Sequence, residues 1–537
     1  MEVWLREEHG KKKVREPGFL VRCVIILALG FVVSVASPTF CMSEERCPSN
    51  TGEETQTEHP AEEIPEKSST TTHKVTIDGK EHTYTAVAGE IVIEIKERDA
   101  KARVFYVSYT LEGNEGADRP ISFAFNGGPG AASVWLHLGC LGPMTVRLND
   151  NGTVLPPPVE YGENPDTWLA FTDLVFVDPV GTGFSRGEPD KQETSTKFYG
   201  VMEDIESVAE FIRVYLGREN RWISPTFLVG ESYGTTRVSS LAWYLHQRYG
   251  VETNGIVLIS PVLDYDTILF HPSNDLPHVL FLPSYAAAAW HHHLLQKEMK
   301  DKELDPFLDE VEQFCLTDYM VLLAQGENLS FEDRQRLEDR LAAYTGLPKP
   351  LILRANFRVD WMTFTKNLLR DEHQLVGRMD SSITGIDPDP TSHMPAYDPS
   401  LDPLFGPFSS AMNAYVRNEL GYESDLFYEF LNQRVTRSWD WRSGLMMGQG
   451  YIDVSHRLRD AMAINKDLAV FVASGLYDLA TPYFAATYTV SHMWLGPQRS
   501  NVAHKIYRSG HMIYTQTEAR KKLFEDTQIF YERTLHR

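Results

Sequence analysis

Gly230 to Gly234 have the residue types and the spacing that a nucleophilic serine needs. They read Gly-Glu-Ser-Tyr-Gly, end an apolar run (226–230) and precede a stretch that fits a helix (235–249). A GxSxG sequence between a strand and a helix is typical of a nucleophile elbow, in which the glycines permit a tight, strained turn. The motif predicts that Ser232 is held above one edge of a sheet, and an ordinary turn is the alternative.

A serine hydroxyl becomes an effective nucleophile only when a neighbouring base removes its proton. Asp478 and His511 each follow an apolar run further along the chain, in the order serine, acid, histidine that a nucleophile elbow usually has. We therefore expect Ser232 to attack, His511 to move the proton, and Asp478 to orient and stabilise the histidine. Asp264 is a weaker rival for the acid.

A glycine-rich stretch could stabilise the negative charge that develops when the serine attacks a carbonyl. Asn126-Gly127-Gly128-Pro129-Gly130 follows the apolar run 121–125 directly. Enzymes with a nucleophile elbow form an oxyanion hole from the N–H after the nucleophile and an N–H of such a loop. The expected donors are the backbone N–H groups of Gly128 and Tyr233, and a generic turn is the alternative.

The elements that must position these residues alternate between strands and helices. Residues 201–217 carry apolar side chains at steps of three and four, which indicates one buried helix face. Short apolar runs bounded by turn residues fit strands that are buried on both faces. The runs are 104–110, 121–125, 174–178, 226–230, 256–260, 468–474 and 504–509. This alternation predicts an α/β fold with a mostly parallel central sheet.

The rhythm of strands and helices breaks in the middle of the chain. Residues 262–465 are rich in helical patterns and loops, which predicts a helical cap inserted into one catalytic domain over 73–537. A cap above the carboxyl ends of parallel strands is where substrate selection usually occurs. We find no internal repeat that would suggest another architecture.

The N-terminal region has the pattern of an export signal. Six basic residues lie in residues 1–22, and an uncharged apolar stretch follows, ending in a small-x-small pattern at Ala36. We expect residues 1–36 to be a signal peptide or, alternatively, an uncleaved signal anchor. Residues 37–72 are acidic and poor in apolar residues, which predicts a disordered linker. The protein is thus expected to be exported, periplasmic or secreted, with attachment to the membrane only through an uncleaved anchor.

Composition and charge exclude several classes of protein. The 537 residues carry a formal net charge of −23, which disfavours binding to nucleic acid because phosphate backbones would be repelled. The five cysteines have neither zinc-site spacing nor the density of a disulfide framework, so neither a zinc site nor a disulfide scaffold is expected. The sequence makes no prediction of oligomeric state.

Taken together, five motifs resemble the serine carboxypeptidases, the S10 family of peptidases. In chain order they are NGGPG (126–130), VDPVGTGFS (177–185), GESYG (230–234), GLYDLATP (475–482) and SGHM (509–512). The resemblance implies an α/β-hydrolase fold with a helical cap, no cofactor, and removal of C-terminal residues from peptides. It also implies that Asn126 and a protonated Glu231 bind the substrate carboxylate.

The chain departs from the family pattern near this carboxylate site. Ala124, Cys140 and Ala131 stand where the family usually has a tryptophan, a glutamate and a cysteine. Without a second carboxyl group at 140, the pKa of Glu231 is expected near its reference of about 4.3, unless burial alone raises it. Turnover of peptides is then expected to favour neutral pH, and ester turnover to be strong relative to peptides.

The sequence therefore predicts a serine-type carboxypeptidase that acts through an acyl-enzyme intermediate on peptide or small acyl substrates. An esterase or acyltransferase with the same triad is the alternative within the enzymes. A catalytically inactive binding protein on the same fold is the alternative outside them, and the intact Ser232, Asp478 and His511 argue against it.

Overall fold

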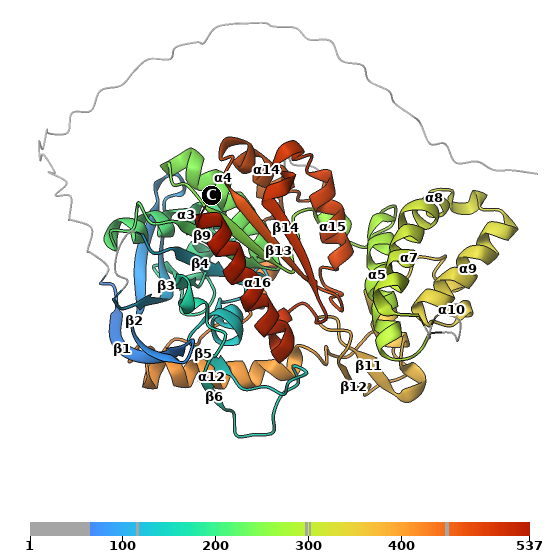
Figure 1. Cartoon of the computed structure of the whole chain (residues 1–537), viewed down its shortest axis with the longest axis horizontal. Coiled ribbons are helices and arrows are strands. Elements are labelled where there is room, and N and C mark those ends of the chain that lie inside the picture. The colour runs from blue at the N-terminus through green and yellow to red at the C-terminus, as the bar shows by residue number, and fades with distance from the viewer. Residues whose placement is uncertain (1–64, 114–117, 296–298, 300–301, 446–449, 537) are drawn as a thin grey trace, which may run out of the picture. The chain divides into compact units, whose positions relative to one another are not determined.

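The computed structural model describes residues 65–536, except for 114–117, 296–298, 300–301 and 446–449 (Figure 1). A ten-stranded sheet runs through the described chain in the order β1-β2-β3-β7-β4-β9-β10-β13-β14, and β8 pairs with β3. Its strands are β1 (Ser68–Ile77), β2 (Lys80–Ile95), β3 (Ala100–Leu111), β4 (Ile121–Phe125), β7 (Asp173–Val177), β8 (Arg186–Glu188), β9 (Thr226–Glu231), β10 (Gly255–Ile259), β13 (Ala469–Gly475) and β14 (Val502–Tyr507).

The direction of the strands divides the sheet into two parts. From β7 through β4, β9, β10 and β13 to β14, every neighbouring pair is parallel. Strand β2 is antiparallel to both β1 and β3, and β3 is antiparallel to β7. The sheet is therefore mostly parallel with an antiparallel edge, and this confirms the α/β class predicted from the sequence.

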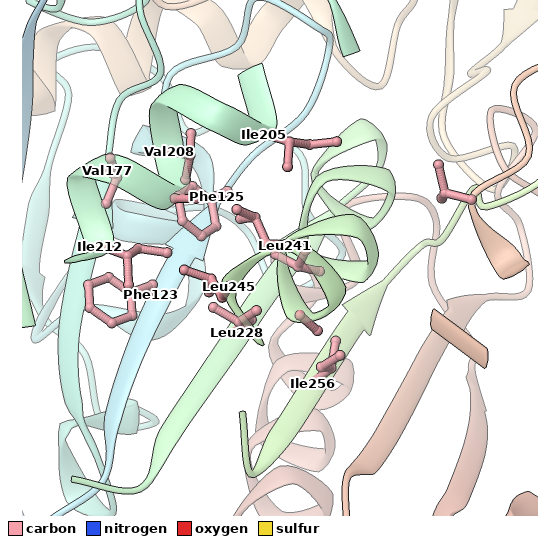
Figure 2. Close-up of a cluster of buried hydrophobic side chains, with 14 of the residues drawn as sticks. Phe123, Phe125, Val177, Ile205, Val208, Ile212, Leu228, Leu241, Leu245 and Ile256 are labelled. Atoms are coloured by element: carbon pink, nitrogen blue, oxygen red, sulfur yellow. The ribbon is translucent and has the colours of Figure 1, made fainter. Parts of the chain in front are cut away.

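The parallel strands β4, β7, β9, β10 and β13 are buried along their whole length because both of their faces are covered, whereas the edge strand β14 is largely exposed. In β4, Phe123 and Phe125 pack into one core cluster while Ala124 between them packs into the other. Figure 2 shows the first cluster, in which Phe123 and Phe125 lie among apolar side chains of the helices on that face. Successive side chains of the strand thus pack into two different cores, one on each side of the sheet.

Different helices complete the two cores. The first face is covered by α3 (Val201–Arg218), α4 (Tyr233–Tyr249) and α14 (Ser455–Ile464). The second face is covered by α1 (Val134–Leu136), α12 (Phe405–Asn418) and α16 (Thr517–Leu535). In α3, the side chains expected on one apolar face are all buried, which confirms the helix predicted over 201–217: Val201, Ile205, Val208, Ile212 and Tyr215.

The segment expected to form one cap over 262–465 has two parts in the structure. Its first part builds a third apolar cluster, which also includes residues 476–485 around the loop after β13. The elements of this cap cluster are α5 (Leu276–His291), α7 (Leu304–Phe314), α8 (Met320–Leu323), α9 (Phe331–Thr345), α10 (Lys349–Arg354), α11 (Trp361–Asn367), β11 (Gln374–Val376) and α15 (Tyr483–His492). The later part, including α12 and α14, packs against the sheet instead. The cap is thus shorter than expected. The sequence did not indicate this, because helices that cover a sheet and helices that cover each other have the same apolar pattern.

The remaining short elements connect these layers. They are β5 (Met144–Val146), β6 (Tyr161–Glu163), α2 (Gln192–Thr196), β12 (Thr384–Ile386) and α13 (Gln433–Ser438). At the N-terminal side, β1 begins at Ser68, so the last five residues of the segment expected to be a linker belong to a strand. This strand is rich in threonine and largely exposed, and its composition is therefore close to that of a linker.

The predicted export signal and most of the predicted linker lie outside the described residues. Within the part of the chain that the structure describes, no helix combines the length and the apolar character needed to cross a bilayer.

Candidate active site

Ser232 occupies a sharp turn between a strand and a helix. Strand β9 ends at Glu231 and α4 begins at Tyr233, so Ser232 is the single residue between them. Its φ of 59° and ψ of −127° lie in a region that residues with a Cβ rarely adopt. The backbone N–H of Ser232 donates to the carbonyl of Ile259 at 3.0 Å, which holds the turn against β10. Because both neighbours of Ser232 are buried and Ser232 itself is half-buried, the turn presents its side chain as a nucleophile elbow does.

Asp478 and His511 form a buried hydrogen-bonded pair. The His511 Nδ1–H donates to Asp478 Oδ2 at 2.7 Å, and the other carboxylate oxygen accepts the N–H groups of Ala480 at 2.7 Å and Thr481 at 2.9 Å. Burial lowers the pKa of His511, but the charge and the hydrogen bond of Asp478 outweigh it and raise the pKa above 6.5. This arrangement fixes the His511 tautomer so that Nε2 is the free base.

The rival acid is not bonded to the histidine. Asp264 caps the turn Tyr265–Thr267 and accepts the N–H of Asp266 at 3.0 Å. Burial raises the pKa of Asp264 to about 6. Asp264 therefore has a local structural partner, whereas Asp478 is the acid that contacts His511.

A second serine, which the sequence did not indicate, connects the loops that carry Asp478 and His511. Ser260 follows β10 and donates its side-chain hydroxyl to the backbone carbonyl of His511 at 2.6 Å. Thr481 Oγ1 lies 2.9 Å from the carbonyl oxygen of Ser260 and 2.9 Å from Asp478 Oδ2. Since Ile259, the residue before Ser260, accepts the N–H of Ser232, the end of β10 bonds directly to Ser232 and His511 and reaches Asp478 through Thr481.

The candidate nucleophile Ser232 and the candidate base His511 are not hydrogen-bonded to each other in this structure. Among the described residues, Ser232 Oγ makes no hydrogen bond with His511. Such contacts are often long before substrate binds and shorten in the complex with substrate.

The glycine-rich loop after β4 packs directly on the elbow. A Cβ added to Gly127 would lie 2.4 Å from the backbone nitrogen of Tyr233 and 2.9 Å from that of Gly234. Gly128 has a φ of +104°, a conformation that side chains rarely allow. The two expected oxyanion donors, the N–H groups of Gly128 and Tyr233, therefore come from segments in van der Waals contact beside Ser232.

Glu231 holds its two carboxylate oxygens in different surroundings. Asn126 Nδ2 donates to Glu231 Oε2 at 2.5 Å, and the hydroxyl of Tyr514 donates to the same oxygen at 2.8 Å. The other oxygen, Oε1, accepts no hydrogen bond from any described residue. Burial raises the pKa of Glu231 to about 7, and the charge of His511 opposes this rise. A neutral Glu231 would carry its proton on Oε1, where it could donate to an anionic group of a substrate.

The pKa of Glu231 is raised although Cys140 stands where a second carboxyl group was expected. Loss of a second carboxyl group was expected to bring the pKa near about 4.3 unless burial kept it high, and burial keeps it high. Cys140 is buried in a π-helical turn (His137–Leu141), and burial raises the pKa of its thiol, so the side chain is neutral. Tyr514, three residues after His511, supplies the contact to Glu231 in this chain.

Replacing Tyr514 with phenylalanine tests this contact. The Tyr514 hydroxyl donates to Glu231 and thereby lowers the pKa of the carboxyl. Tyr514→Phe is expected to move the apparent pKa that Glu231 gives to substrate turnover to higher pH, since the ionised form loses a donor. Rate measurements from pH 5 to 9 on both proteins would check the shift, and an unchanged or lower pKa would contradict it.

Two further features bear on what the site can bind. Among the described residues, no group of three or more histidine, cysteine or acidic side chains could hold a metal ion. A cavity of about 580 Å³ is bordered by α7, α15 and α16, with Asp305, Tyr483 and Lys522 in its wall. None of the candidate triad residues lines this cavity.

Comparisons with known proteins agree with this geometry. Residues 89–319 match a family model described as serine carboxypeptidase, and the chain resembles that family. A probable serine carboxypeptidase from Arthroderma benhamiae is 28% identical over 33% of this chain and 34% of its own length. Serine carboxypeptidase-like 2 from Arabidopsis thaliana is 28% identical over 31% of this chain and 38% of its own. The match thus spans little more than a third of these relatives.

A solved structure extends the likeness in fold over most of the chain. The crystal structure of Kex1(delta)p, a prohormone-processing carboxypeptidase from Saccharomyces cerevisiae, covers 84% of this chain and 92% of its own, with a TM-score of 0.51 and 16% identity. At this identity the likeness concerns the fold, which is the α/β-hydrolase fold predicted from the sequence.

Proposed function

We propose that this chain, which resembles the serine carboxypeptidases over residues 89–319, is a serine-type carboxypeptidase that removes C-terminal residues from peptides. The observation that carries the proposal is Glu231, a buried acid next to the nucleophile whose pKa is raised to about 7 and whose Oε1 has no partner among the described residues. An acid that stays neutral at this position can accept a peptide's terminal carboxylate instead of repelling it.

In the proposed mechanism, Ser232 Oγ attacks the carbonyl carbon of the last peptide bond while His511 Nε2 takes the hydroxyl proton. The oxyanion that forms accepts hydrogen bonds from the N–H groups of Gly128 and Tyr233. His511 returns the proton to the leaving amine, and the C–N bond breaks to leave an acyl group on Ser232. Water, deprotonated by His511, then releases the shortened peptide. Asp478 stabilises the imidazolium in both steps.

The leaving residue is held through its own carboxylate. Asn126 Nδ2 has two hydrogens and uses one on Glu231, so the other remains for the substrate. The proton on Glu231 Oε1 provides a second donor of the same kind. Asn126 is itself fixed, because its Oδ1 accepts the N–H of Leu136 at 3.0 Å. The two donors would position the terminal residue so that the bond before it reaches Ser232.

The deciding experiment is digestion of a peptide library by the purified protein, followed by mass spectrometry. We expect residues to leave one at a time from the C-terminus, and peptides with a C-terminal amide to be poor substrates. Internal cleavage, or equal cleavage of acids and amides, would contradict a carboxypeptidase. Cleavage of esters with no release of amino acids would instead favour the esterase or acyltransferase alternative, which none of the similar proteins named above favours.

The pH dependence of peptide turnover follows from the two buried groups. His511 must be neutral, so kcat/KM should fall as pH drops through its pKa, which is raised above 6.5. Glu231 must be protonated, so kcat/KM should also fall as pH rises through about 7. Because the two groups interact, the profile reports the pair, and we expect a narrow bell centred near neutral pH.

A matched substrate and a matched variant isolate the alkaline side of this bell. An ester without a carboxylate needs only a neutral His511, so its kcat/KM should stay high above pH 7. Glu231→Gln is expected to remove the alkaline fall for peptides, since glutamine has no proton to lose. If the ester and the peptide lose activity together above pH 7, the fall belongs to another group and the role of Glu231 is wrong.

The cellular setting is also part of the proposal. We infer from the basic and apolar N-terminal pattern that the protein is exported, as a secreted or periplasmic enzyme, with an uncleaved anchor as the alternative. Its partners are then peptides or small acyl compounds. Sequencing the N-terminus of the mature protein would distinguish cleavage after Ala36 from retention of the segment.

A further inference from the structure

The segment between β11 and β12 lies against both loops that carry the candidate acid and base. The carbonyl of Arg378 accepts the N–H of Leu479 at 2.9 Å, and the carbonyl of Met379 accepts the N–H of His511 at 2.6 Å. Arg378 is therefore tied by its backbone to the residue after Asp478, and its neighbour is tied to the catalytic histidine. The sequence reasoning did not identify this segment.

The side chain of Arg378 is a half-buried cation without a hydrogen-bond or ion-pair partner among the described residues. Its guanidinium lies over the ring of Trp361, with 4.4 Å between the guanidinium carbon and the ring centroid. Its Nε is buried and has no hydrogen-bond partner, and the guanidinium forms no ion pair with any described acid. Trp361 begins α11 and packs against the cap cluster, so the cation lies between the cap and the catalytic loops.

The acids near Arg378, Asp398 and Asp478, already accept hydrogen bonds from other groups. Asp398 accepts the backbone N–H groups of Arg378 at 3.2 Å and of Met379 at 3.1 Å, and Asp478 is bonded to His511. Arg237, which is fully buried, is paired with Asp204 at 2.8 Å. Arg378 has no such acid, although its Nε is buried, and a guanidinium cannot lose its charge as a lysine can.

We propose that Arg378, stacked on Trp361, is a subsite that binds a carboxylate of the substrate near the scissile bond. A guanidinium offers two parallel N–H donors that match the two oxygens of a carboxylate, and stacking on the indole holds that fork in place. The subsite is distinct from Glu231 and Asn126, and it rests on the proposed function only in that the substrate is attacked by Ser232. The carboxylate comes from an acidic side chain on the acyl side of the scissile bond, because the proposed function assigns the terminal carboxylate to Glu231 and Asn126.

The test compares substrates that differ only in one carboxylate. Two esters with the same leaving group, one with a free carboxylate on its acyl part and one with the neutral amide, are turned over by the unmodified protein and by Arg378→Gln. We expect the ratio of kcat/KM, carboxylate over neutral, to exceed one in the unmodified protein and to fall about 10- to 100-fold in Arg378→Gln, as for loss of a charge-assisted hydrogen bond. Arg378→Lys, which keeps the charge without the fork, should give an intermediate ratio.

Peptides then test the same position in a natural type of substrate. Peptides with glutamate or glutamine as the residue before the last are compared in the same two proteins. A loss in Arg378→Gln that follows glutamate over glutamine supports the subsite, and an equal loss for both peptides would overturn it.

Arg457 provides the matched control. Its guanidinium also lies over a tryptophan, 5.8 Å from the ring centroid of Trp243, but on α14 at the face of α4. Arg457→Gln removes the same charge and should leave the carboxylate ratio unchanged. Equal losses in the two variants, or a ratio that does not change in Arg378→Gln, would overturn the subsite.

The ester measurements separate this inference from the proposed function. If no peptide is shortened but the ester ratio falls in Arg378→Gln, the carboxypeptidase proposal fails and the subsite stands. If peptides are shortened and the unmodified protein shows no preference for the carboxylate ester or for peptides that bear an additional carboxylate, the subsite fails and the carboxypeptidase stands. Absence of a carboxylate preference in the unmodified protein overturns the subsite even if Arg378→Gln does not fold, and Arg378→Lys then supplies the comparison with a variant.

Discussion

Ser232→Ala is expected to lower kcat by about four to six powers of ten while the fold is retained. The serine oxygen forms the covalent bond in the proposed mechanism, and what remains is the rate supplied by binding and the oxyanion hole. Ser232 makes no side-chain hydrogen bond that the fold depends on among the described residues, and alanine fits the same turn. Single-turnover measurements and a fluorophosphonate probe, which labels only an activated serine, would check both the rate and the site.

Helix α4, which begins directly after Ser232, offers a control for this substitution. Ser239 is buried on α4, and its hydroxyl has no hydrogen-bond partner among the described residues. Ser239→Ala removes the same atom close to the site and should change kcat by less than about threefold. More than about a tenth of the original activity in Ser232→Ala would show that the nucleophile lies elsewhere.

His511→Ala should cost about as much as Ser232→Ala, and the double variant should cost no more than either. Residues that act as one unit lose their contributions together, so their effects do not add. Asp478→Asn is expected to lower kcat by about 10⁴-fold, because an amide would favour the wrong tautomer of His511. Strictly additive losses in the double variant would contradict a joint role for Ser232 and His511.

The order of the motifs was enough to predict the strands and the candidate catalytic residues. Each expected strand is present within a few residues. The inner parallel strands leave an unbroken apolar run because they are buried on both faces, whereas the edge strand β14 is largely exposed. Ser232, Asp478 and His511 follow such runs, and the carboxyl ends of parallel strands meet at one edge. Their approach therefore follows from the topology, which the sequence pattern predicts.

The contacts that tune the site were not predictable in the same way. Tyr514, Ser260 and Arg378 reach the site through loops whose path depends on the packing of distant segments. Thr481 could have been found, since a threonine three residues after an aspartate commonly bonds that acid's side chain. The pKa of Glu231 depends on burial, which no local spacing reports.

The second large effect is expected at the glycines beside the elbow. Gly128→Ala should lower kcat by about 10²- to 10³-fold with less than about a threefold change in KM. Its φ of +104° forces an alanine to distort the loop, and the N–H of residue 128 would no longer point at the developing oxyanion. A donor used mainly in the transition state affects kcat, whereas one that binds the ground state would raise KM.

Gly127→Ala should act on the other donor and is expected to be at least as damaging. Its Cβ would lie 2.4 Å from the backbone nitrogen of Tyr233, so the peptide after Ser232 must move. Gly79, in the turn between β1 and β2, has a φ of +73° and open space around it, so Gly79→Ala imposes comparable backbone strain far from the elbow along the chain. Melting temperatures of the three variants would report the strain, and kcat would report the oxyanion hole. If Gly79→Ala lowered kcat as much as Gly128→Ala, or if Gly128→Ala acted through KM alone, the loop would be a structural turn and the oxyanion would be stabilised elsewhere.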